Sequence, residues 1–185
     1  MSGRFTIKPT SIAGVVELDR KPLVDQRGFL ERLYCDADLE DILGPRTIRQ
    51  INRTSTKGQG VVRGMHFQRG NAGETKLITC TRGRIFDVAV DLRRGSPTFL
   101  QWHGCILEGE AHRSLLIPEG CAHGFQTLSD DVEIIYFHTA PYDSMQEGGV
   151  HPLDPKIAVD WPHQPNGMSE RDLSHPLLTD NFEGI

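Results

Sequence analysis

Short runs in which apolar and polar residues alternate recur along most of this chain, and turns with glycine or proline separate several of them. The clearest run spans residues 84–92. Every second side chain there is apolar and falls on one face of an extended chain: Phe86, Val88, Val90 and Leu92. Weaker forms of the pattern occupy residues 15–18, 47–53, 60–67, 75–81, 99–107, 114–117, 124–128 and 132–138. About nine strands joined by such turns are typical of an all-β sandwich or barrel.

Two segments depart from this pattern. Residues 36–43 have helical spacing, because Leu39, Ile42 and Leu43 share a face and an aspartate can cap the first turn. With no alternation of strands and helices, a parallel α/β sheet is not expected. After Trp161 the composition shifts to Pro, Asn, Gly, Ser and His, so residues 162–185 are predicted to be an irregular tail with one charged cluster at 169–172.

Length and charge narrow the class of protein. The 185 residues fit one domain, residues 1–185, with a single core. The net charge is -5 and basic residues are scattered, which argues against a nucleic-acid partner. No segment approaches the roughly 20 apolar residues of a membrane helix, and the first ten residues lack the apolar core of a signal peptide. We therefore expect no membrane partner and a cytoplasmic location.

The cysteine pattern favours free thiols over a metal site or disulfides. The four cysteines form no C-x-x-C pair and are sparse for a disulfide scaffold: Cys35, Cys80, Cys105 and Cys121. We expect most of them to be buried and reduced, and no structural zinc site.

Three polar residues on predicted strands each have two interpretations. His66 shares a face with Gly64 and Gln68, where it could be a general base or a hydrogen-bonded core residue. Lys76 could point into the same interior or extend to solvent at a strand end. Local sequence favours the structural interpretation of both. Tyr136 could donate a proton or simply line the barrel, and its spacing does not separate these.

The segment PEGCAHGF at residues 118–125 has the P-x-G-x-x-H form of the second motif of metal-binding cupins. This motif raises the alternative of a metal-dependent cupin, such as a dioxygenase. Such a site also needs an H-x-H pair, but the chain reads H-F-Q at residues 66–68. Only His66 and His123 remain as ligands, which are too few for a stable mononuclear site, so we expect no metal.

Seven segments together resemble the dTDP-4-dehydrorhamnose 3,5-epimerase family. They extend over nearly the whole chain: DQRGFLE at 25–31, QINRTS at 50–55, GVVRGMHFQ at 60–68, GRIFDVAVDLRRGSPTF at 83–99, PEGCAHGF at 118–125, DPKIAVDWP at 154–162 and SERD at 169–172. Ordered agreement of this kind is much more specific than any one motif.

The resemblance implies a cupin-like jelly-roll barrel with short peripheral helices that works as a homodimer. Residues 1–50 would contribute strands and a helix to the dimer, and the tail at 162–185 would close the site. The implied reaction inverts C3, C5 or both of a nucleotide-linked 4-keto-6-deoxyhexose through an enolate, without metal or nicotinamide cofactor.

The resemblance also implies roles for individual residues. The family's catalytic groups fall on a base, the aspartate that orients it, an acid, and a lysine facing the enolate: His66, Asp172, Tyr136 and Lys76. Its substrate contacts fall on Arg63, Gln50, Asn52, His123, Arg27, Tyr142 and Arg171. Opposed acid and base are needed for inversion, since one group that removed and returned the proton would tend to restore the starting configuration.

Some positions depart from the family pattern. Leu30 stands where relatives have an aromatic residue and Arg32 where they have an acid, which replaces a hydrogen-bond acceptor by a donor near the nucleotide base. The loop R-G-N-A-G-E-T at 69–75 lacks the usual proline, and His138 and Pro141 are atypical neighbours of Tyr142. The nucleotide, which could be CDP or GDP, and the inverted carbons therefore stay open. A monofunctional 3- or 5-epimerase and a silent binding protein remain alternatives.

Overall fold

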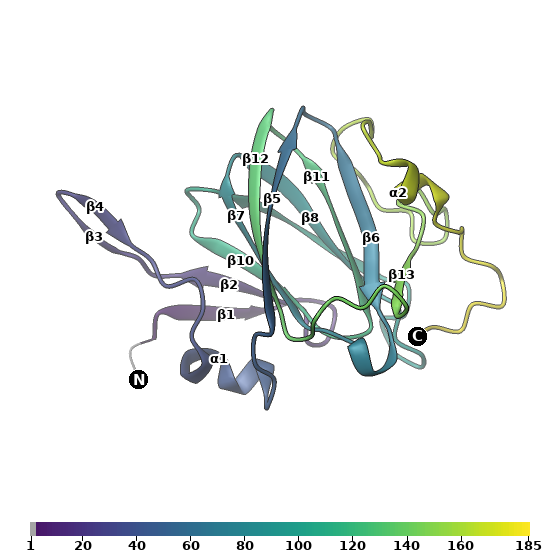
Figure 1. Cartoon of the computed structure of the whole chain (residues 1–185), viewed down its shortest axis with the longest axis horizontal. Coiled ribbons are helices and arrows are strands. Elements are labelled where there is room, and N and C mark those ends of the chain that lie inside the picture. The colour runs from purple at the N-terminus through teal and green to yellow at the C-terminus, as the bar shows by residue number, and fades with distance from the viewer. Residues whose placement is uncertain (1–2) are drawn as a thin grey trace.

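The computed structural model describes residues 3–185 and packs two antiparallel β-sheets face to face (Figure 1). In spatial order, the six-stranded sheet contains β1 (Phe5–Pro9), β2 (Val16–Arg20), β10 (Arg113–Ile117), β7 (Lys76–Arg82), β12 (Asp131–His138) and β5 (Gln50–Lys57). The five-stranded sheet contains β13 (Glu147–Gly149), β6 (Val62–Gln68), β11 (Cys121–Thr127), β8 (Arg84–Asp91) and β9 (Trp102–Glu108). Residues 1–2 of the expected N-terminal segment 1–50 lie outside the described residues.

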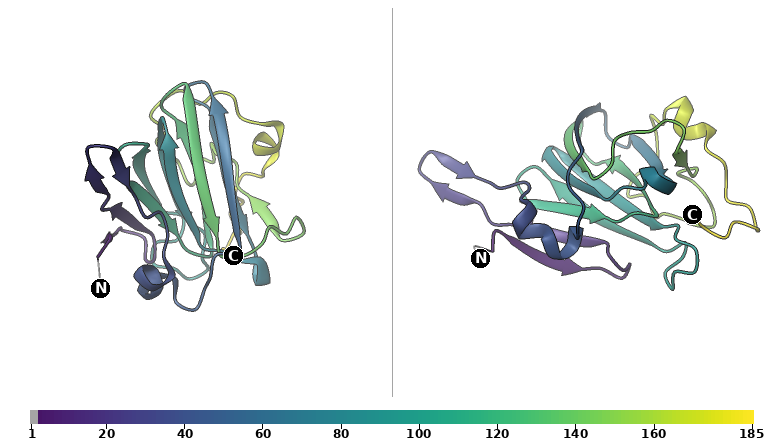
Figure 2. Two further views of the ribbon diagram at one scale, coloured as in Figure 1. Left: turned by 60° about the vertical axis from the view of Figure 1, so that its left-hand side comes forward. Right: turned by 60° about the horizontal axis from the view of Figure 1, so that its bottom comes forward.

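A separate hairpin of β3 (Leu23–Asp25) and β4 (Gly28–Leu30) projects from this sandwich, as Figure 1 and the right-hand view of Figure 2 show. The helices are peripheral: α1 (Asp36–Leu43), a 3-10 turn (Gly70–Ala72) and α2 (Glu170–Ser174). The fold is therefore the expected all-β, cupin-like jelly roll with short peripheral helices.

Three apolar clusters account for the layering. The first lies between the sheets and includes Ile78, Ile134 and Phe125. The second lies on the outer face of the five-stranded sheet, where the C-terminal tail covers it with side chains such as Phe182. The third lies on the outer face of the six-stranded sheet, where Leu39 of α1 packs. Because covered sheets bury both faces, strands such as β7 and β11 lose part of the polar–apolar alternation.

The alternation along β8 is confirmed. Its apolar face lies outward under the C-terminal tail, whereas Asp87 points inward and is fully buried. The same holds for β6, where Met65 and Phe67 belong to the outer cluster and His66 faces the space between the sheets. Asp87 of β8 and His66 of β6 are thus brought together on the inner face of the five-stranded sheet.

All nine predicted strands are present, with shifted ends. β5 starts at Gln50 rather than at residue 47, and β11 starts at Cys121 rather than at residue 124. Four short strands were not predicted: β1, β3, β4 and β13. β1, β3 and β4 are largely exposed, and β13 reads Glu-Gly-Gly, so none has a buried face that would produce alternation.

The predicted helix at 36–43 is confirmed, but its capping prediction is wrong. The N-cap is Cys35 without a side-chain cap, and the acidic residues lie inside the first turn, where the helix dipole favours them. The tail prediction also needs correction, since residues 170–174 form α2, whose N-cap Ser169 accepts a hydrogen bond from the backbone of Asp172.

The four cysteines are free, and three of them are buried, as expected. Among residues 3–185, no helix has both the length and the apolar character needed to span a bilayer.

Candidate active site

A cavity of about 300 Å³ opens between the two sheets and collects most of the predicted site residues. Both sheets and two loops contribute to its wall. The predicted residues that line it are Gln50, Asn52, Arg63, His66, Lys76, His123, Tyr136, Tyr142 and Arg171. This volume is at the lower end of the range typical of small-molecule sites. His66 and Tyr136 come from opposite sheets, so a ligand in this cavity would lie between them.

Two glycines bring β6 and β11 unusually close beside the cavity. A Cβ atom on Gly64 would lie 2.5 Å from Cα of Gly124, and Gly64 also has a φ of +132°, which favours glycine. The close approach makes His66 and His123 register partners. Glycine at these positions therefore places two imidazoles side by side in the cavity wall.

His66 is paired with a carboxylate that comes from the distant C-terminal tail. Its Nε2 lies 2.7 Å from Oδ1 of Asp172, which is almost fully buried at the start of α2. Burial alone would raise the pKa of Asp172, but the hydrogen bonds from His66, Ser169 and the backbone of Gly64, with the charge of His66, together outweigh this and lower the pKa. Because an ionised carboxylate only accepts hydrogen bonds, Nε2 of His66 bears the hydrogen and Nδ1 retains a lone pair.

Tyr136 lies between two histidine rings. His123 contacts it edge-on at 5.9 Å between ring centroids, and His138 stacks on it at 6.0 Å. His123 is itself held by Asp87, 2.7 Å from its Nε2. Burial raises the pKa of the Tyr136 phenol, so this group stays protonated at neutral pH and can donate a proton.

Lys76 is buried at the end of the cavity. Its Nζ donates a hydrogen bond to the backbone oxygen of His66 at 3.2 Å and lies 3.4 Å from a carboxylate oxygen of Glu74. Burial lowers the pKa of Lys76, and the charge of Glu74 opposes this effect. An ammonium in such surroundings interacts strongly with any negative charge that develops nearby.

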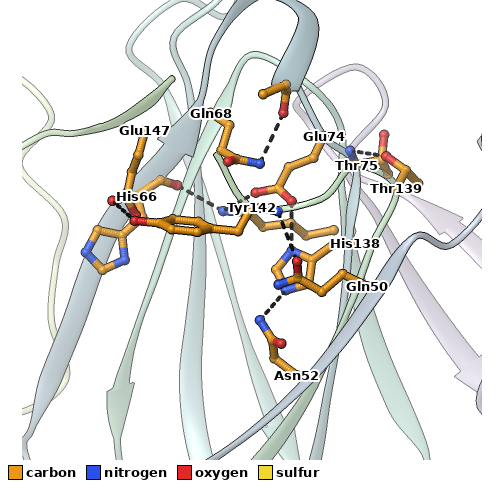
Figure 3. Close-up of polar contacts among 12 residues, drawn as sticks. Gln50, Asn52, His66, Gln68, Glu74, Thr75, His138, Thr139, Tyr142 and Glu147 are labelled. Carbon is orange, nitrogen blue, oxygen red and sulfur yellow. Dashed lines mark hydrogen bonds and ion pairs between the residues drawn. The ribbon is translucent and has the colours of Figure 1, made fainter. Parts of the chain in front are cut away.

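Polar contacts continue from Glu74 along one wall (Figure 3). The second oxygen of Glu74 accepts a hydrogen bond from Nδ1 of His138 at 2.8 Å, and Nε2 of His138 lies 3.4 Å from the amide nitrogen of Asn52. Sequence reasoning identified His138 only as atypical and did not single out Glu74. A glutamate two residues before a buried lysine was the available signal.

The rim of the cavity contains a second polar group. Tyr142 donates through its hydroxyl to Glu147 at 2.9 Å (Figure 3). Arg171 forms an ion pair with the same carboxylate. The backbone nitrogen of Tyr142 donates to the side chain of Gln50 at 3.0 Å. Glu147 was missed in the sequence because it lies in a segment without alternation.

One predicted substrate contact lies elsewhere. Arg27 is at the tip of the β3–β4 hairpin, with 84% of its side chain exposed and an ion pair to Asp25 at 2.6 Å. It does not line the cavity of its own chain. Sequence order could not reveal this, because the hairpin projects away from the sandwich (Figure 1).

Two further residues of the site carried no clear sequence signal. Asp87 is a buried acid in an apolar strand, which is the kind of residue that needs a partner, but the partner His123 could not be identified. His175 packs 5.3 Å from the ring of His66 and against Gly149, where an added Cβ would lie 2.3 Å from the His175 ring.

Among residues 3–185, two groups of side chains have donor atoms close enough to share a metal ion. They are Glu17, His103 and Cys105, and His66, Asp172 and His175; within each group the donor atoms lie within 4.8 Å. Neither group contains the pair His66 and His123 on which the cupin oxygenase alternative depended. Each histidine of that pair instead bonds a carboxylate of its own.

Comparisons with known proteins match one family over nearly the whole chain. Residues 9–180 match the family model described as dTDP-4-dehydrorhamnose 3,5-epimerase. A dTDP-4-dehydrorhamnose 3,5-epimerase of Salmonella typhimurium is 43% identical over 91% of this chain and 93% of its own length. A dTDP-4-dehydrorhamnose 3-epimerase of Streptomyces niveus is 41% identical over 94% of this chain and 84% of its own.

A solved structure is also closely similar. The dTDP-6-deoxy-D-glucose-3,5-epimerase of Legionella pneumophila, in complex with dTDP-4-keto-L-rhamnose, superposes with a TM-score of 0.88 at 38% identity, covering 94% of this chain and 92% of that one. These matches support the epimerase hypothesis and give no support to the cupin oxygenase alternative.

Proposed function

The chain belongs to the dTDP-4-dehydrorhamnose 3,5-epimerase family, and on that premise we propose how its cavity inverts carbon centres of a dTDP-linked 4-keto-6-deoxyhexose. The protein is an isomerase of the epimerase class. The observation that carries the proposal is the placement of His66 and Tyr136 on opposite sheets around one cavity that also contains the buried Lys76.

In this proposal, His66 removes the proton from C3 or C5. Its Nδ1 has the free lone pair, and Asp172 stabilises the imidazolium that forms and fixes the ring. The electron pair of the broken C–H bond moves to the C4 oxygen as an enolate. Lys76 stabilises this oxygen, since an ammonium is most effective where water is excluded.

Tyr136 then returns a proton to the opposite face of the carbon. The enolate electrons re-form the ketone, and the phenol becomes a phenolate. His66 loses its proton to solvent and Tyr136 regains one, so that solvent hydrogen enters the product. Each positioned acid or base typically contributes about 10²- to 10⁴-fold in rate.

The remaining lining residues are proposed substrate contacts. Arg63 and Arg171 have guanidinium groups suited to phosphate oxygens, and Gln50, Asn52 and His123 can bond sugar hydroxyls. Tyr142 would lie beside the nucleotide. Arg171 is paired with Glu147 in the free protein, so phosphate binding would exchange one anionic partner for another.

The test uses dTDP-4-keto-6-deoxy-D-glucose in deuterium oxide, with NMR to locate the label. Deuterium at C3, C5 or both is expected, and the labelled positions distinguish a 3,5-epimerase, like the Salmonella relative, from a 3-epimerase, like the Streptomyces relative. His66→Asn should abolish exchange while dTDP still binds in calorimetry. Competing UDP, CDP and GDP should bind less tightly than dTDP. Uptake at neither carbon would contradict the proposal.

We also propose a homodimer in which the N-terminal segment, residues 1–50, contacts the second copy. The β3–β4 hairpin exposes four apolar side chains: Leu23, Val24, Phe29 and Leu30. A two-stranded hairpin is at best marginally stable alone, so an exposed apolar hairpin indicates a partner surface. Arg27 at its tip would then enter the cavity of the second copy, and the tail at 162–185 would close each cavity.

Mixing two inactive variants tests this arrangement. When Arg27→Ala and His66→Asn homodimers are mixed and exchange subunits, about a quarter of wild-type activity should return. The reason is that each mixed dimer contains one intact site. Absence of any recovery, together with a monomeric mass in light scattering, would refute the shared site. A cytoplasmic location is part of the same proposal, since free thiols persist in a reducing compartment, and cell fractionation tests it.

A further inference from the structure

Glu74 is a buried carboxylate that joins two parts of the cavity wall. It is 8% exposed and lies two residues before Lys76, the first residue of β7. Its Oε1 lies 3.4 Å from Nζ of Lys76, and its Oε2 accepts a hydrogen bond from Nδ1 of His138 at 2.8 Å. Burying a carboxylate is costly unless both oxygens have partners, and here both do.

The contact with Lys76 affects the charge of the lysine. Burial favours the neutral amine, and three carboxylates oppose it: Glu74, Glu147 and Asp87. Glu74 has the largest opposing effect and is the one within ion-pair distance. Burial would raise the pKa of Glu74 itself, but His138 and Lys76 outweigh this and lower it, so the carboxylate is ionised at neutral pH.

The contact with His138 fixes a tautomer. Because the ionised Glu74 only accepts, Nδ1 of His138 bears the hydrogen, and Nε2 can accept from the amide of Asn52 at 3.4 Å. The amide oxygen of Asn52 is then free for another donor. Figure 3 shows Glu74, His138 and Asn52 in sequence along the wall.

We propose that Glu74 is a positioning residue of the epimerisation site, which keeps Lys76 charged beside the enolate and, through His138, orients Asn52 toward the sugar. This inference rests on the proposed function, because Lys76 needs its charge only if an enolate forms next to it. Glu74 lies in the loop at 69–75, which lacks the usual proline, and His138 is atypical near Tyr142, so this hydrogen bond joins two segments that depart from the family pattern.

The pH dependence of kcat/KM tests the effect on Lys76. In Glu74→Gln, the alkaline limb should move down by about one pH unit or more, because the carboxylate no longer opposes the effect of burial on the lysine. The acidic limb, which reports the base, should stay in place. Activity should therefore recover toward the wild-type value as the pH is lowered. An equal loss at every pH would overturn the proposal.

His138→Gln tests the second contact. This change should raise KM several-fold and leave the alkaline limb unmoved, since Lys76 keeps its carboxylate. Glu108→Gln is the matched control, because it removes an exposed carboxylate paired with Arg84 and should change neither limb. A shifted alkaline limb in His138→Gln, or an unchanged KM, would overturn the assigned path from Glu74 to Asn52.

A readout without turnover separates this inference from the proposed function. NMR of protein with 13C-labelled lysine reports the charge of Lys76, whose signal is identified by its loss in Lys76→Arg. In the wild type this signal should remain that of an ammonium throughout the active pH range. In Glu74→Gln the Lys76 signal should titrate within that range. In Glu74→Asp the signal should titrate to a smaller extent, and this variant replaces Glu74→Gln in the experiment if the glutamine variant does not fold. A neutral Lys76 in the wild type overturns the inference, whereas absence of deuterium uptake by the wild type refutes only the proposed function.

Discussion

Replacing Asp172 by asparagine isolates what the tail contributes to the base. The carboxylate lies 2.7 Å from Nε2 of His66 and is 3% exposed, and it does not line the cavity. The amide of Asp172→Asn has nearly the same shape and can still accept through its oxygen. The substitution therefore removes the charge that stabilises the imidazolium and leaves the substrate contacts in place.

The expected size of the effect follows from that hydrogen bond. A hydrogen bond to a charged group contributes about 1.5–3 kcal/mol. Here the carboxylate gives this stabilisation when His66 becomes positive during proton abstraction. Its removal therefore raises the activation barrier and lowers kcat about 10- to 150-fold. KM and the affinity for dTDP should change little, because Asp172 does not line the cavity in which the substrate is proposed to bind.

The assay combines steady-state kinetics with deuterium uptake. Both kcat and the exchange rate should fall together, while calorimetry with dTDP stays unchanged. The control is Asp180→Asn, which alters an almost fully exposed carboxylate of the same tail, paired with Lys156. If Asp172→Asn retained full kcat, or raised KM with kcat unchanged, the assignment of Asp172 to the base would be refuted.

Three other substitutions test the proposed proton donor, the packing of the C-terminal tail and the stability of the fold. Tyr136→Phe should retain deuterium exchange by His66 but slow inversion by about 10²- to 10⁴-fold. The measurement is the ratio of labelled substrate to inverted product. Equal loss of exchange and inversion would contradict the assignment of His66 as base and Tyr136 as acid. Gly149→Ala should lower the free energy of unfolding by about 1–3 kcal/mol and reduce kcat, because the added Cβ would lie 2.3 Å from the His175 ring. Adding His175→Ala to this variant should restore most of the stability and most of kcat. Asp91→Asn should cost about 3 kcal/mol at neutral pH, with kcat nearly unchanged, because the carboxylate accepts from Arg93, Ser96 and Thr98. Burial would raise the pKa of Asp91, but these bonds outweigh it and lower the pKa, so its stabilisation exists above about pH 4 and is lost as the pH falls. Denaturant unfolding at several pH values measures the difference, which should shrink in acid; a constant difference would contradict this account.

The local prediction of the fold was most accurate where burial is periodic. The alternation in β8 and the helical spacing of α1 follow from which side chains face a neighbouring layer, and both were confirmed. β1 and β13 were missed because a largely exposed strand and a glycine-rich strand have no such pattern. The local pattern also did not identify which layer covers each face, since the outer clusters involve the distant tail.

For the site, the sequence by itself predicted a set of reactive groups through its resemblance to the family: His66, Lys76, Tyr136 and Asp172 of the SERD segment. Local sequence alone favoured structural roles for His66 and Lys76. The resemblance also predicted that Asp172 orients His66, and the tertiary structure brings these two residues together across 106 positions. Only the tertiary structure decided that Arg27 lies outside the cavity of its own chain, although it is part of a matching segment. The Glu74–His138 contact likewise joins residues 64 positions apart. Such pairs form because burying a polar group is unfavourable without a partner, and the fold, not the local order of residues, determines which partner is within reach.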